Sequence, residues 1–451
     1  MRLIIIGGVA AGTKAAAKAR RQNPHLEIII YQDEAEVAYS ACGMPYVLSG
    51  VINNSRSLII RLAEDFAKED IQVFTGHRVI HIDRRAKQLT VKNLQADTEQ
   101  TVAFDRLILA TGARPIIPNV EGIGLKGVVT LRCLDDLDRL QGLLTSLQPK
   151  QAVIVGAGYI GLELAEAFHK LAIKTTLLEK SAHILPKFDA EMAALVHQHL
   201  LENQLDLQIG EGLLKLHGEQ GHVSAVETES GKIIAADLVV IAIGIRPNTE
   251  LAIASGIALG TTGAIAVNSR METDAEDIFA AGDCCETQDR ITGKPIWMPL
   301  GDIANLQGRV AGENAAGGDA HFPGVFGTAI FKTFDLQVAT TGLTEKVARE
   351  FGFEPLSILM TRTDKSRYYP DNKQMTLKLI ADKQDGRVLG AQVVGAGGVD
   401  KMIDIVATAL LGKLTCADLE NADLAYSPPF SQVLSPIIVA AGALQGKIGK
   451  G

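Results

Sequence analysis

The stretch LIIIGGVAAG, residues 3–12, decides the fold. This short apolar run and its glycine turn are followed by the alanine-rich residues 13–21 and a second apolar run at residues 26–31. Apolar run, glycine turn, helical stretch and apolar run are the order of a β-α-β unit. The same order recurs from AVIVGAGYIG, residues 152–161, to the apolar run at residues 174–179. Two such units predict an α/β protein with two dinucleotide-binding sites.

Three further apolar runs close with small residues and predict strands that return the chain to the nucleotide-binding domains. They are LILATG at residues 107–112, VVIAIG at residues 239–244 and IFAAGD at residues 278–283. The pattern changes from about residue 326 to mixed strands, a helical stretch at residues 399–411 and a Pro-rich segment around residues 425–436. This change predicts a third domain.

The composition is that of a globular protein with several cores. The chain has 451 residues, of which 47% are hydrophobic and 21% are charged, and this length exceeds one ordinary core. The net charge of -8 and the lack of a dense Lys/Arg block argue against nucleic acid as a partner. No apolar run reaches the roughly 18 to 20 residues that a membrane span needs.

The cysteines and the N-terminus indicate a reducing compartment. Five scattered cysteines fit neither a disulfide framework nor a zinc cluster, and none of the ten histidines falls in a ligand pair. We therefore expect no metal. Met1 and Arg2 lead directly into the first apolar run, which leaves no room for a signal peptide. These features predict a cytoplasmic protein.

The second glycine turn fits the full G-x-G-x-x-G pattern. Such a turn lets the backbone approach a pyrophosphate, which the N-terminus of the next helix then binds. Glu179 closes the following strand, where a carboxylate can hold the ribose hydroxyls. This favours NADH, although Lys180 beside it leaves NADPH open. The candidate NAD(P)H-binding residues are Gly156, Gly158, Tyr159, Ile160, Gly161, Glu179 and Gly244.

The first glycine turn is less regular, because Val9 replaces the middle glycine. Gln32 or Asp33 can contact a ribose here, but an ordinary β-α-β turn without a cofactor stays open. Asp283 ends a predicted strand, where its carboxylate can accept hydrogen bonds from the polyol chain of a flavin. The candidate FAD-binding residues are Gly7, Gly8, Ala11, Gly12, Gln32, Asp33, Thr111, Gly112, Gly282 and Asp283.

Cys42 lies in the stretch YSACGMPY, residues 39–46, between the two glycine turns. The two offsets at which dithiol enzymes carry a second cysteine hold Pro45 and Val47, so Cys42 has no neighbouring redox partner in the sequence. Pro45 is consistent with a helix start, where the helix dipole lowers the pKa of a cysteine. A buried structural cysteine is the alternative, but the position between two nucleotide motifs favours a redox-active one.

Two loops near the C-terminus carry tyrosines next to prolines, at Tyr368-Tyr369-Pro370 and Tyr426-Ser427-Pro428. Aromatic side chains in such loops often pack at an interface. A phenol can also protonate a departing thiolate. The residues alone leave both roles open.

With both glycine turns, Cys42, Ala110-Thr111-Gly112 and Ala281-Gly282-Asp283 in this order, the chain resembles the single-cysteine branch of the flavoprotein disulfide reductases from end to end. Within that branch it is most similar to coenzyme A disulfide reductases and their NADH oxidase relatives. The resemblance implies two Rossmann-like dinucleotide-binding domains, as in glutathione reductase, and a C-terminal α+β dimerisation domain. The implied bounds are residues 1–117 and 245–324 for FAD, 118–244 for NAD(P)H and 325–451 for dimerisation.

The resemblance also implies cofactors and roles. FAD receives hydride from NADH and passes electrons to Cys42 in a homodimer. Tyr426 and either Tyr368 or Tyr369, from the partner subunit, protonate the leaving thiolate, and Tyr159 shields the flavin until the nicotinamide displaces it. Coenzyme A itself is expected to bind through Arg20, Arg21 and Ser40.

One departure from the relatives narrows the activity. NADH peroxidases and water-forming oxidases carry a histidine in the first glycine turn, where this chain has Ala10. Cleavage of a hydroperoxide needs a proton donor there, so reduction of a small disulfide or persulfide is favoured, with coenzyme A disulfide first. The alternatives are an NADH oxidase that reduces oxygen and a reductase that passes electrons to a protein partner.

Overall fold

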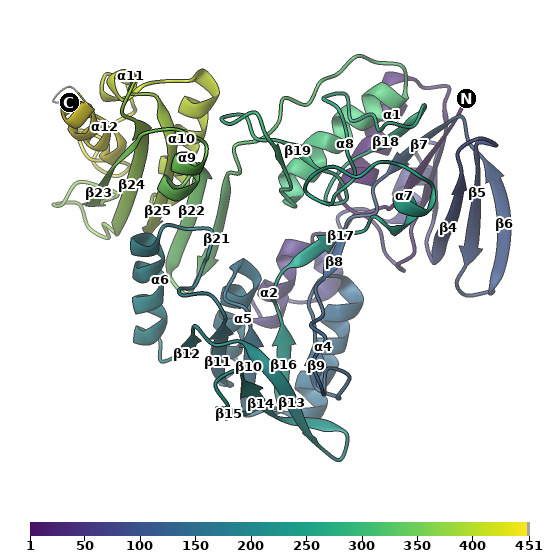
Figure 1. The fold of residues 1–451 in the computed structure, drawn as a ribbon, viewed down its shortest axis with the longest axis horizontal. Coiled ribbons are helices and arrows are strands. Elements are labelled where there is room, and N and C mark those ends of the chain that lie inside the picture. The colour runs from purple at the N-terminus through teal and green to yellow at the C-terminus, as the bar shows by residue number, and fades with distance from the viewer. Residues whose placement is uncertain (449–451) are drawn as a thin grey trace. The chain divides into compact units, whose positions relative to one another are not determined.

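The computed structural model describes residues 1–448, and the chain forms two compact units (Figure 1). The first unit contains Met1–Ile116, Thr130–Ser146 and Gly244–Val325. The second unit contains Ile117–Val129, Leu147–Ile243 and the chain from Phe326 onward. The chain therefore leaves the first unit and returns to it twice.

The first unit is built on a five-stranded parallel sheet with the order β18-β7-β1-β2-β3. Its strands are β1 (Arg2–Ile6), β2 (Glu27–Tyr31), β3 (Ile71–Phe74), β7 (Arg106–Leu109) and β18 (Ile278–Ala280). Leu3, Ile4 and Ile5 are fully buried, because both faces of such a sheet are covered. The apolar runs at residues 3–6, 26–31, 107–112 and 278–283 each contain a strand as predicted, and the last two strands end before the small residues that close the runs.

Helices and smaller sheets complete the first unit. The helices are α1 (Ala11–Gln22), α2 (Met44–Leu48), α3 (Ala63–Ala67), α4 (Leu134–Leu147), α7 (Glu250–Ala254) and α8 (Gly301–Ala315), with 3₁₀ turns η1 (Ala41–Gly43) and η2 (Ser55–Leu58). The smaller sheets contain β4 (His77–Asp83), β5 (Gln88–Asn93), β6 (Thr98–Ala103), β8 (Ala113–Pro115), β17 (Ile245–Pro247), β19 (Thr287–Gln288) and β20 (Pro295–Ile296).

Helices α1 and α8 pack with their backbones in close contact. A Cβ atom at Gly308 would lie 2.3 Å from the carbonyl oxygen of Ala11, and one at Gly312 would lie 2.2 Å from that of Ala15. Only glycine allows this approach. Gly308 and Gly312 are thus needed to hold α1, which follows the first glycine turn, against the rest of the unit.

The second unit holds the other five-stranded parallel sheet, with the order β12-β11-β10-β16-β9. Its strands are β9 (Val128–Val129), β10 (Gln151–Val155), β11 (Lys174–Glu179), β12 (Asp206–Ile209) and β16 (Leu238–Ile241), with helices α5 (Tyr159–Lys170) and α6 (Ala190–Glu202). The antiparallel strands β13 (Leu213–Glu219), β14 (His222–Thr228) and β15 (Ile233–Ala235) form a separate sheet. The second predicted β-α-β unit is confirmed as β10-α5-β11.

The C-terminal part of the second unit is an antiparallel sheet with helices, in the order β21-β22-β25-β24-β23. The strands are β21 (Ala329–Thr333), β22 (Leu336–Gly342), β23 (Pro355–Thr363), β24 (Gln374–Asp382) and β25 (Val388–Gly395). The helices are α9 (Glu345–Glu350), α10 (Val399–Gly412), α11 (Cys416–Glu420) and α12 (Pro436–Ile448). The predicted helix at residues 399–411 is confirmed, whereas α12 had no predicted counterpart. No helix within residues 1–448 has both the length and the apolar character to cross a membrane.

Candidate active site and dinucleotide-binding turns

Both glycine turns begin in the same backbone conformation. The φ angles of Gly7 and Gly156 are 103° and 109°, in the region that favours glycine. A Cβ atom on Gly7 would lie 2.1 Å from the carbonyl oxygen of Ala110, and one on Gly156 would lie 2.4 Å from that of Ala242. The residues that follow β7 and β16 are thus in direct backbone contact with the turns, which explains why the turns begin with glycine.

The helix that follows each turn starts against the first glycine of that turn. A Cβ atom at Gly12 would lie 1.8 Å from the carbonyl oxygen of Gly7, and one at Gly161 would lie 2.0 Å from that of Gly156. At Gly158, in contrast, a Cβ atom would meet nothing within 4 Å. An open glycine turn at a helix N-terminus fits a pyrophosphate, because the backbone N–H groups and the helix dipole bind anions.

Gln32 and Glu179 occupy matching places beside the two turns. The N–H of Gly8 donates to Oε1 of Gln32 at 2.6 Å, and the N–H of Ala157 donates to Oε2 of Glu179 at 2.8 Å. Both side chains are buried. Asp33 lies at the surface, where it pairs with Arg78 at 3.2 Å. Of the two ribose-binding candidates in the first unit, the structure brings Gln32 to the turn.

Asp283 follows β18 and forms an ion pair with Arg132. Nη2 of Arg132 lies 2.7 Å from Oδ2 of Asp283, whose side chain is only 14% exposed. Burial raises the pKa of the Asp283 carboxyl, and Arg132 acts in the opposite direction. The hydroxyl of Thr111 donates to the carbonyl of Asn248 at 2.8 Å, and Gly112 has a φ angle of 67°. Acceptors for hydroxyls and a guanidinium for phosphate thus lie around the first turn, which fits FAD.

Arg132 was not among the predicted site residues. It directly follows the buried Leu131, which is the only local signal for a guanidinium placed at a site. Gly282 is positioned by another buried residue that the sequence analysis missed, since its N–H donates to Oε1 of Gln307 at 2.8 Å. Both contacts join segments that are far apart in the sequence.

Cys42 lies in the 3₁₀ turn η1, directly before the short helix α2 with Pro45 in its first turn. It is the exposed one of the five cysteines, none of which forms a disulfide. Burial raises the pKa of Cys133 to about 11 and that of Cys416 to about 12, and Cys284 and Cys285 are buried. Because the thiolate is the nucleophile, Cys42 is the thiol best placed to react with a disulfide from solvent.

The residues before Cys42 hold its turn in place. The N–H of Ser40 donates to the carbonyl of Leu58 at 2.9 Å, and the carbonyl of Ser40 accepts the N–H of Gly43 at 3.2 Å. The hydroxyl of Tyr39 donates to Glu34 at 2.6 Å, and burial raises the pKa of this phenol. Ser40, a predicted substrate contact, therefore has a clear structural role as well.

The two arginines at the end of α1 differ in what they contact. The guanidinium of Arg20 donates to the carbonyls of Glu69, Pro24 and Asp70, at 3.0, 2.6 and 2.6 Å. Arg21 is exposed. The structure commits most of the Arg20 guanidinium to the backbone, so the predicted contact with coenzyme A depends chiefly on Arg21.

Tyr159, the first residue of α5, packs against the C-terminal part of the second unit. Its ring stacks on Phe331 of β21 with 4.7 Å between centroids and 26° between planes, and burial raises the pKa of its phenol to about 12. Ile160 is 40% exposed. Gly244, the remaining candidate, has a φ angle of 114° and belongs to the first unit. The other NAD(P)H candidates all lie in the second unit.

The two tyrosine loops meet. Tyr368 and Tyr426 share a hydrogen bond, which lowers the pKa of Tyr368 and raises that of Tyr426, and the buried Ser366 hydrogen-bonds to both phenols. Tyr369 lies instead near Lys365, with 5.9 Å from Nζ to the ring centroid. The structure thus pairs Tyr426 with Tyr368 rather than with Tyr369.

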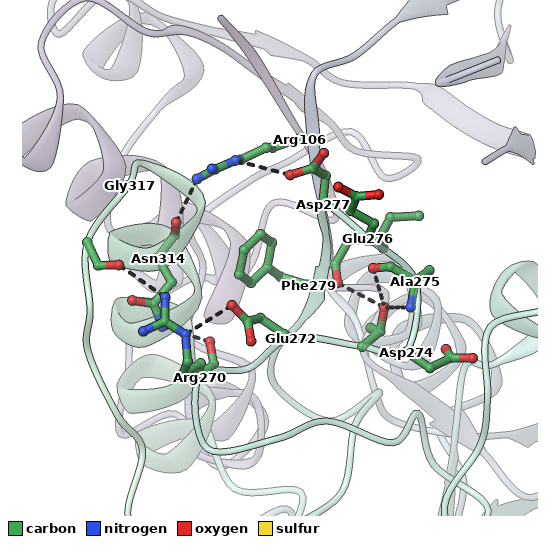
Figure 2. Close-up of a pocket in the computed structure, with 13 residues that line it drawn as sticks. Arg106, Arg270, Glu272, Asp274, Ala275, Glu276, Asp277, Phe279, Asn314 and Gly317 are labelled. Atoms are coloured by element: carbon green, nitrogen blue, oxygen red, sulfur yellow. Dashed lines mark hydrogen bonds and ion pairs between the residues drawn. The ribbon is translucent and has the colours of Figure 1, made fainter. Parts of the chain in front are cut away.

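A cavity of about 500 Å³ lies at the amino ends of the strands of the first sheet, where β7 and β18 begin (Figure 2). The glycine turn lies at the carboxyl end of β1, on the other side of the sheet's length. Ligands of open parallel sheets bind at the carboxyl ends of the strands. The guanidinium of Arg106 donates to the carbonyls of Asn314 and Ala315 at the end of α8, which complements the helix dipole. Arg106 therefore has a structural role in this cavity, because it holds the C-terminal end of α8.

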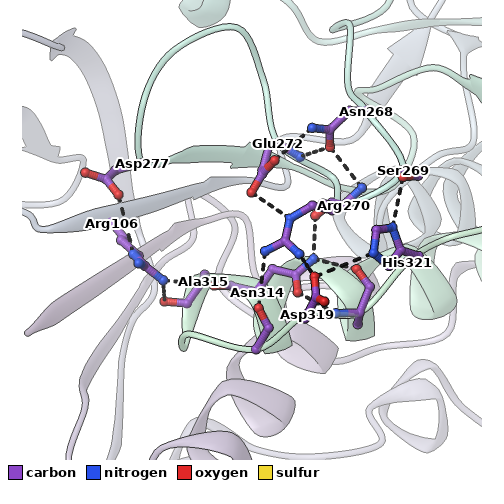
Figure 3. Close-up of polar contacts among 12 residues, drawn as sticks. Arg106, Asn268, Ser269, Arg270, Glu272, Asp277, Asn314, Ala315, Asp319 and His321 are labelled. Atoms are coloured by element: carbon purple, nitrogen blue, oxygen red, sulfur yellow. Dashed lines mark hydrogen bonds and ion pairs between the residues drawn. The ribbon is translucent and has the colours of Figure 1, made fainter.

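The other arginine of this cavity is also engaged. Figure 3 shows Arg270 in contact with Glu272 and Asp319. The side chain of Asn314, 2% exposed, donates to the carbonyls of Arg270 and Ala320 at 2.8 Å each. These contacts hold the segment that follows α8 in place. Within residues 1–448, no group of His, Cys, Asp or Glu side chains is placed to hold a metal ion.

Two family models cover most of the chain. Residues 1–299 match the pyridine nucleotide-disulphide oxidoreductase model, and residues 328–436 match the dimerisation domain of the same family. The chain belongs to the pyridine nucleotide-disulphide oxidoreductases. It is an FAD- and NAD(P)H-dependent oxidoreductase with two Rossmann-like domains and a C-terminal α+β dimerisation domain, so the expected fold class and cofactors are confirmed.

Relatives of this oxidoreductase match it over nearly their whole length. A CoA-dependent NAD(P)H sulfur oxidoreductase of Pyrococcus abyssi is 36% identical, and an NADH oxidase of Methanocaldococcus jannaschii is 37% identical, with 98% of each chain covered. A coenzyme A disulfide reductase of Staphylococcus aureus is 28% identical over 95% of this chain and 96% of its own. The solved structure of an NAD-dependent persulfide reductase from A. fulgidus is 40% identical, with a TM-score of 0.96 over 100% of this chain and 84% of its own.

Proposed function

We propose that this oxidoreductase uses NADH to reduce a small disulfide or persulfide through Cys42, with coenzyme A disulfide as the favoured substrate. The observation that carries the proposal is the exposure of Cys42, in a turn of the unit that also holds the first glycine turn. Relatives named for coenzyme A disulfide and for CoA-dependent sulfur reduction support the choice of substrate.

The chemistry at Cys42 needs one sulfur and two electrons in each cycle. The Cys42 thiolate attacks one sulfur of the substrate, so a mixed disulfide forms, the substrate S–S bond breaks and one thiolate leaves. The two electrons that reduce this mixed disulfide would come from NADH by way of bound FAD. The S–S bond of the mixed disulfide then breaks, the second thiol leaves and Cys42 returns to the thiolate. NADH and one proton are consumed for two thiols released.

Tyr426 and Tyr368 are proposed to protonate the leaving thiolate in a homodimer. Their loops are exposed, as are the apolar side chains of Phe430, Val433 and Leu434, which are 73%, 68% and 58% exposed. Such a patch on a dimerisation domain is suited to cover by a second copy of the chain. The tyrosines would then act at Cys42 of the partner subunit.

The Tyr426→Phe variant is expected to lower kcat for the disulfide by about 10²-fold or more, because it removes a general acid. The ring stays, so packing is preserved. The rate at which NADH reduces the flavin should be unchanged. Stopped-flow and steady-state kinetics measure both rates. Tyr369→Phe is the matched control, and an equal loss of kcat in both variants would contradict the role of Tyr426.

An NADH oxidase is the second candidate, because one relative bears that name. The first turn carries Ala10, which has no group to protonate a peroxide. An oxidase of this chain would therefore reduce oxygen without an acid from this position. Electron transfer to a protein partner is the remaining alternative.

The test is NADH oxidation by the FAD-loaded protein, first without oxygen in the presence of coenzyme A disulfide and then in air without it. Anaerobic turnover that produces two thiols per NADH is expected. Turnover in air alone would assign the protein as an NADH oxidase. Slow turnover under both conditions would point to a persulfide or a protein as acceptor. The domain bounds at residues 117, 244 and 324 and the cytoplasmic location stay predictions.

A further inference from the structure

Glu179 is fixed beside the second glycine turn with both carboxylate oxygens in use. Oε2 accepts the N–H of Ala157 and Oε1 accepts the N–H of Ser181, each at 2.8 Å, and the residue is 8% exposed. A carboxylate at this place accepts hydrogen bonds from the ribose hydroxyls of NADH. It repels the 2′-phosphate of NADPH, so by itself it selects NADH.

Lys180, the next residue, places a positive charge beside Glu179 at the end of β11. Its side chain is 73% exposed, and its ammonium lies 2.8 Å from Oε1 of Glu229. A cation directly after the ribose-binding carboxylate is placed to accept a 2′-phosphate. In the structure this cation is held by a carboxylate of the chain itself.

Glu229 is positioned by the backbone around it. Its N–H donates to the carbonyl of Gly212 at 2.9 Å, and a Cβ atom on Gly212 would lie 2.5 Å from the Glu229 carboxyl carbon. The carboxylate therefore lies directly over Gly212. This places a negative charge within reach of Lys180.

We propose that Glu229 determines the choice between NADH and NADPH, because it competes with the 2′-phosphate for Lys180. The inference rests on the proposed use of a nicotinamide dinucleotide at the second turn, and it does not depend on the electron acceptor. Both side chains of the pair are largely exposed, at 73% and 47%, and exposed ion pairs are weak. A 2′-phosphate carries more negative charge at pH 7 than one carboxylate, so it can displace Glu229.

The other charged groups near Lys180 have partners of their own. They support a competition between Glu229 and the 2′-phosphate for Lys180 rather than a fixed preference for NADH. Glu211 is the other carboxylate near this edge, and hydrogen bonds from Ser230 and Thr228 lower its pKa. Lys232 donates to Gln208 at 2.7 Å. Lys180 is thus the cation next to Glu179, and Glu229 is the anion that neutralises it.

The test is the dissociation constants of NADH and NADPH, measured by anaerobic equilibrium titration of the FAD-loaded protein. In Glu229→Gln, NADPH is expected to bind about fivefold more tightly, while the affinity for NADH changes less than twofold. In Lys180→Gln, NADPH is expected to bind about tenfold more weakly, with little change for NADH. In the double variant the effect of Glu229→Gln should disappear.

The matched control is Glu219→Gln, which removes the same charge from an exposed residue at the end of β13. It should leave both affinities unchanged. Equal changes for NADH and NADPH in Glu229→Gln, or an effect of Glu229→Gln that persists without Lys180, would overturn the proposal. Because the titration needs no disulfide, a wrong assignment of the acceptor would leave this result intact. A protein that binds neither dinucleotide would instead refute the proposed function.

Discussion

Replacement of Cys42 by serine is expected to lower turnover with coenzyme A disulfide at least about 10³-fold, while NADH still reduces the bound flavin. Serine keeps the size and polarity of the side chain, but its oxygen cannot form the mixed disulfide that the reaction requires. Cys42 is exposed in η1, so the substitution should leave the fold intact. Steady-state assays without oxygen, together with stopped-flow reduction by NADH, separate the two half-reactions.

The matched control for this variant is Cys133→Ser. Cys133 lies in the same unit and is half-buried, and burial raises the pKa of its thiol to about 11. A thiol that stays protonated near neutral pH is a poor nucleophile, so this variant should keep its activity. If Cys42→Ser kept a tenth of the wild-type turnover, the redox-active sulfur would have to lie elsewhere. The same would follow if Cys133→Ser lost as much turnover as is expected for Cys42→Ser.

The two β-α-β units could be predicted because their signals are local. A buried parallel strand needs a continuous apolar run, and the turn after it needs glycine where φ is positive and where a side chain would collide with the next strand. Gly7 and Gly156 meet both conditions, with Cβ positions only 2.1 and 2.4 Å from carbonyl oxygens. The pattern of residues 3–12 therefore predicted both the fold and the position of the first turn.

Contacts between distant segments could not be predicted in the same way. Whether Gln32 or Asp33 faces the first turn depends on a hydrogen bond to Gly8, and both residues follow the same strand. The guanidinium of Arg20, a predicted coenzyme A contact, donates to the carbonyls of Glu69 and Asp70, and no local pattern indicates these partners. Such hydrogen bonds depend on how distant loops pack together, and a local sequence pattern does not predict that packing.

Three further features of the fold have local signals in the sequence. Pro436 was assigned to a Pro-rich segment, but it begins helix α12, and proline is favoured in the first turn of a helix. Gly308 and Gly312 are four residues apart on α8, a spacing that puts both on one face. Lys378 interrupts an apolar run in β24, and a charge in such a run indicates a buried ion pair.

Lys378 is the centre of a buried charge cluster in the second unit. Its side chain is 2% exposed, and its ammonium lies 2.9 Å from Asp189, 2.5 Å from Glu191 and 2.9 Å from Glu345. Asp189 and Glu191 begin helix α6 of the parallel sheet, whereas Glu345 begins α9 of the C-terminal part. The cluster therefore ties the second dinucleotide-binding domain to the dimerisation domain.

The Lys378→Met variant is expected to lose about 3–5 kcal/mol of unfolding free energy, because removal of the buried cation leaves the largely buried carboxylates of Asp189 and Glu345 uncompensated. Methionine fills similar space, so the loss of unfolding free energy comes from the missing charge rather than from a cavity. Denaturation of the FAD-loaded protein at one fixed concentration measures it, since cofactor and subunit binding also shift apparent stability. The control is Lys68→Met, which breaks the exposed pair with Asp65 at 2.8 Å and should leave the unfolding free energy nearly unchanged, because solvent screens exposed ion pairs.

The pH dependence of this loss separates charge from packing. Burial alone would raise the pKa of Glu345, but hydrogen bonds from Ser357, Lys378 and Arg349 outweigh it and lower the pKa from 4.5 to about 2. A carboxyl with a lowered folded-state pKa contributes stability that is fully present above pH 4.5 and is lost as the pH falls towards 2. The difference between wild type and Lys378→Met should therefore be largest near neutral pH and shrink below pH 4.5. A difference that stays constant from pH 7 to pH 3 would assign the loss to packing, because protonation of the carboxylates would then have relieved nothing.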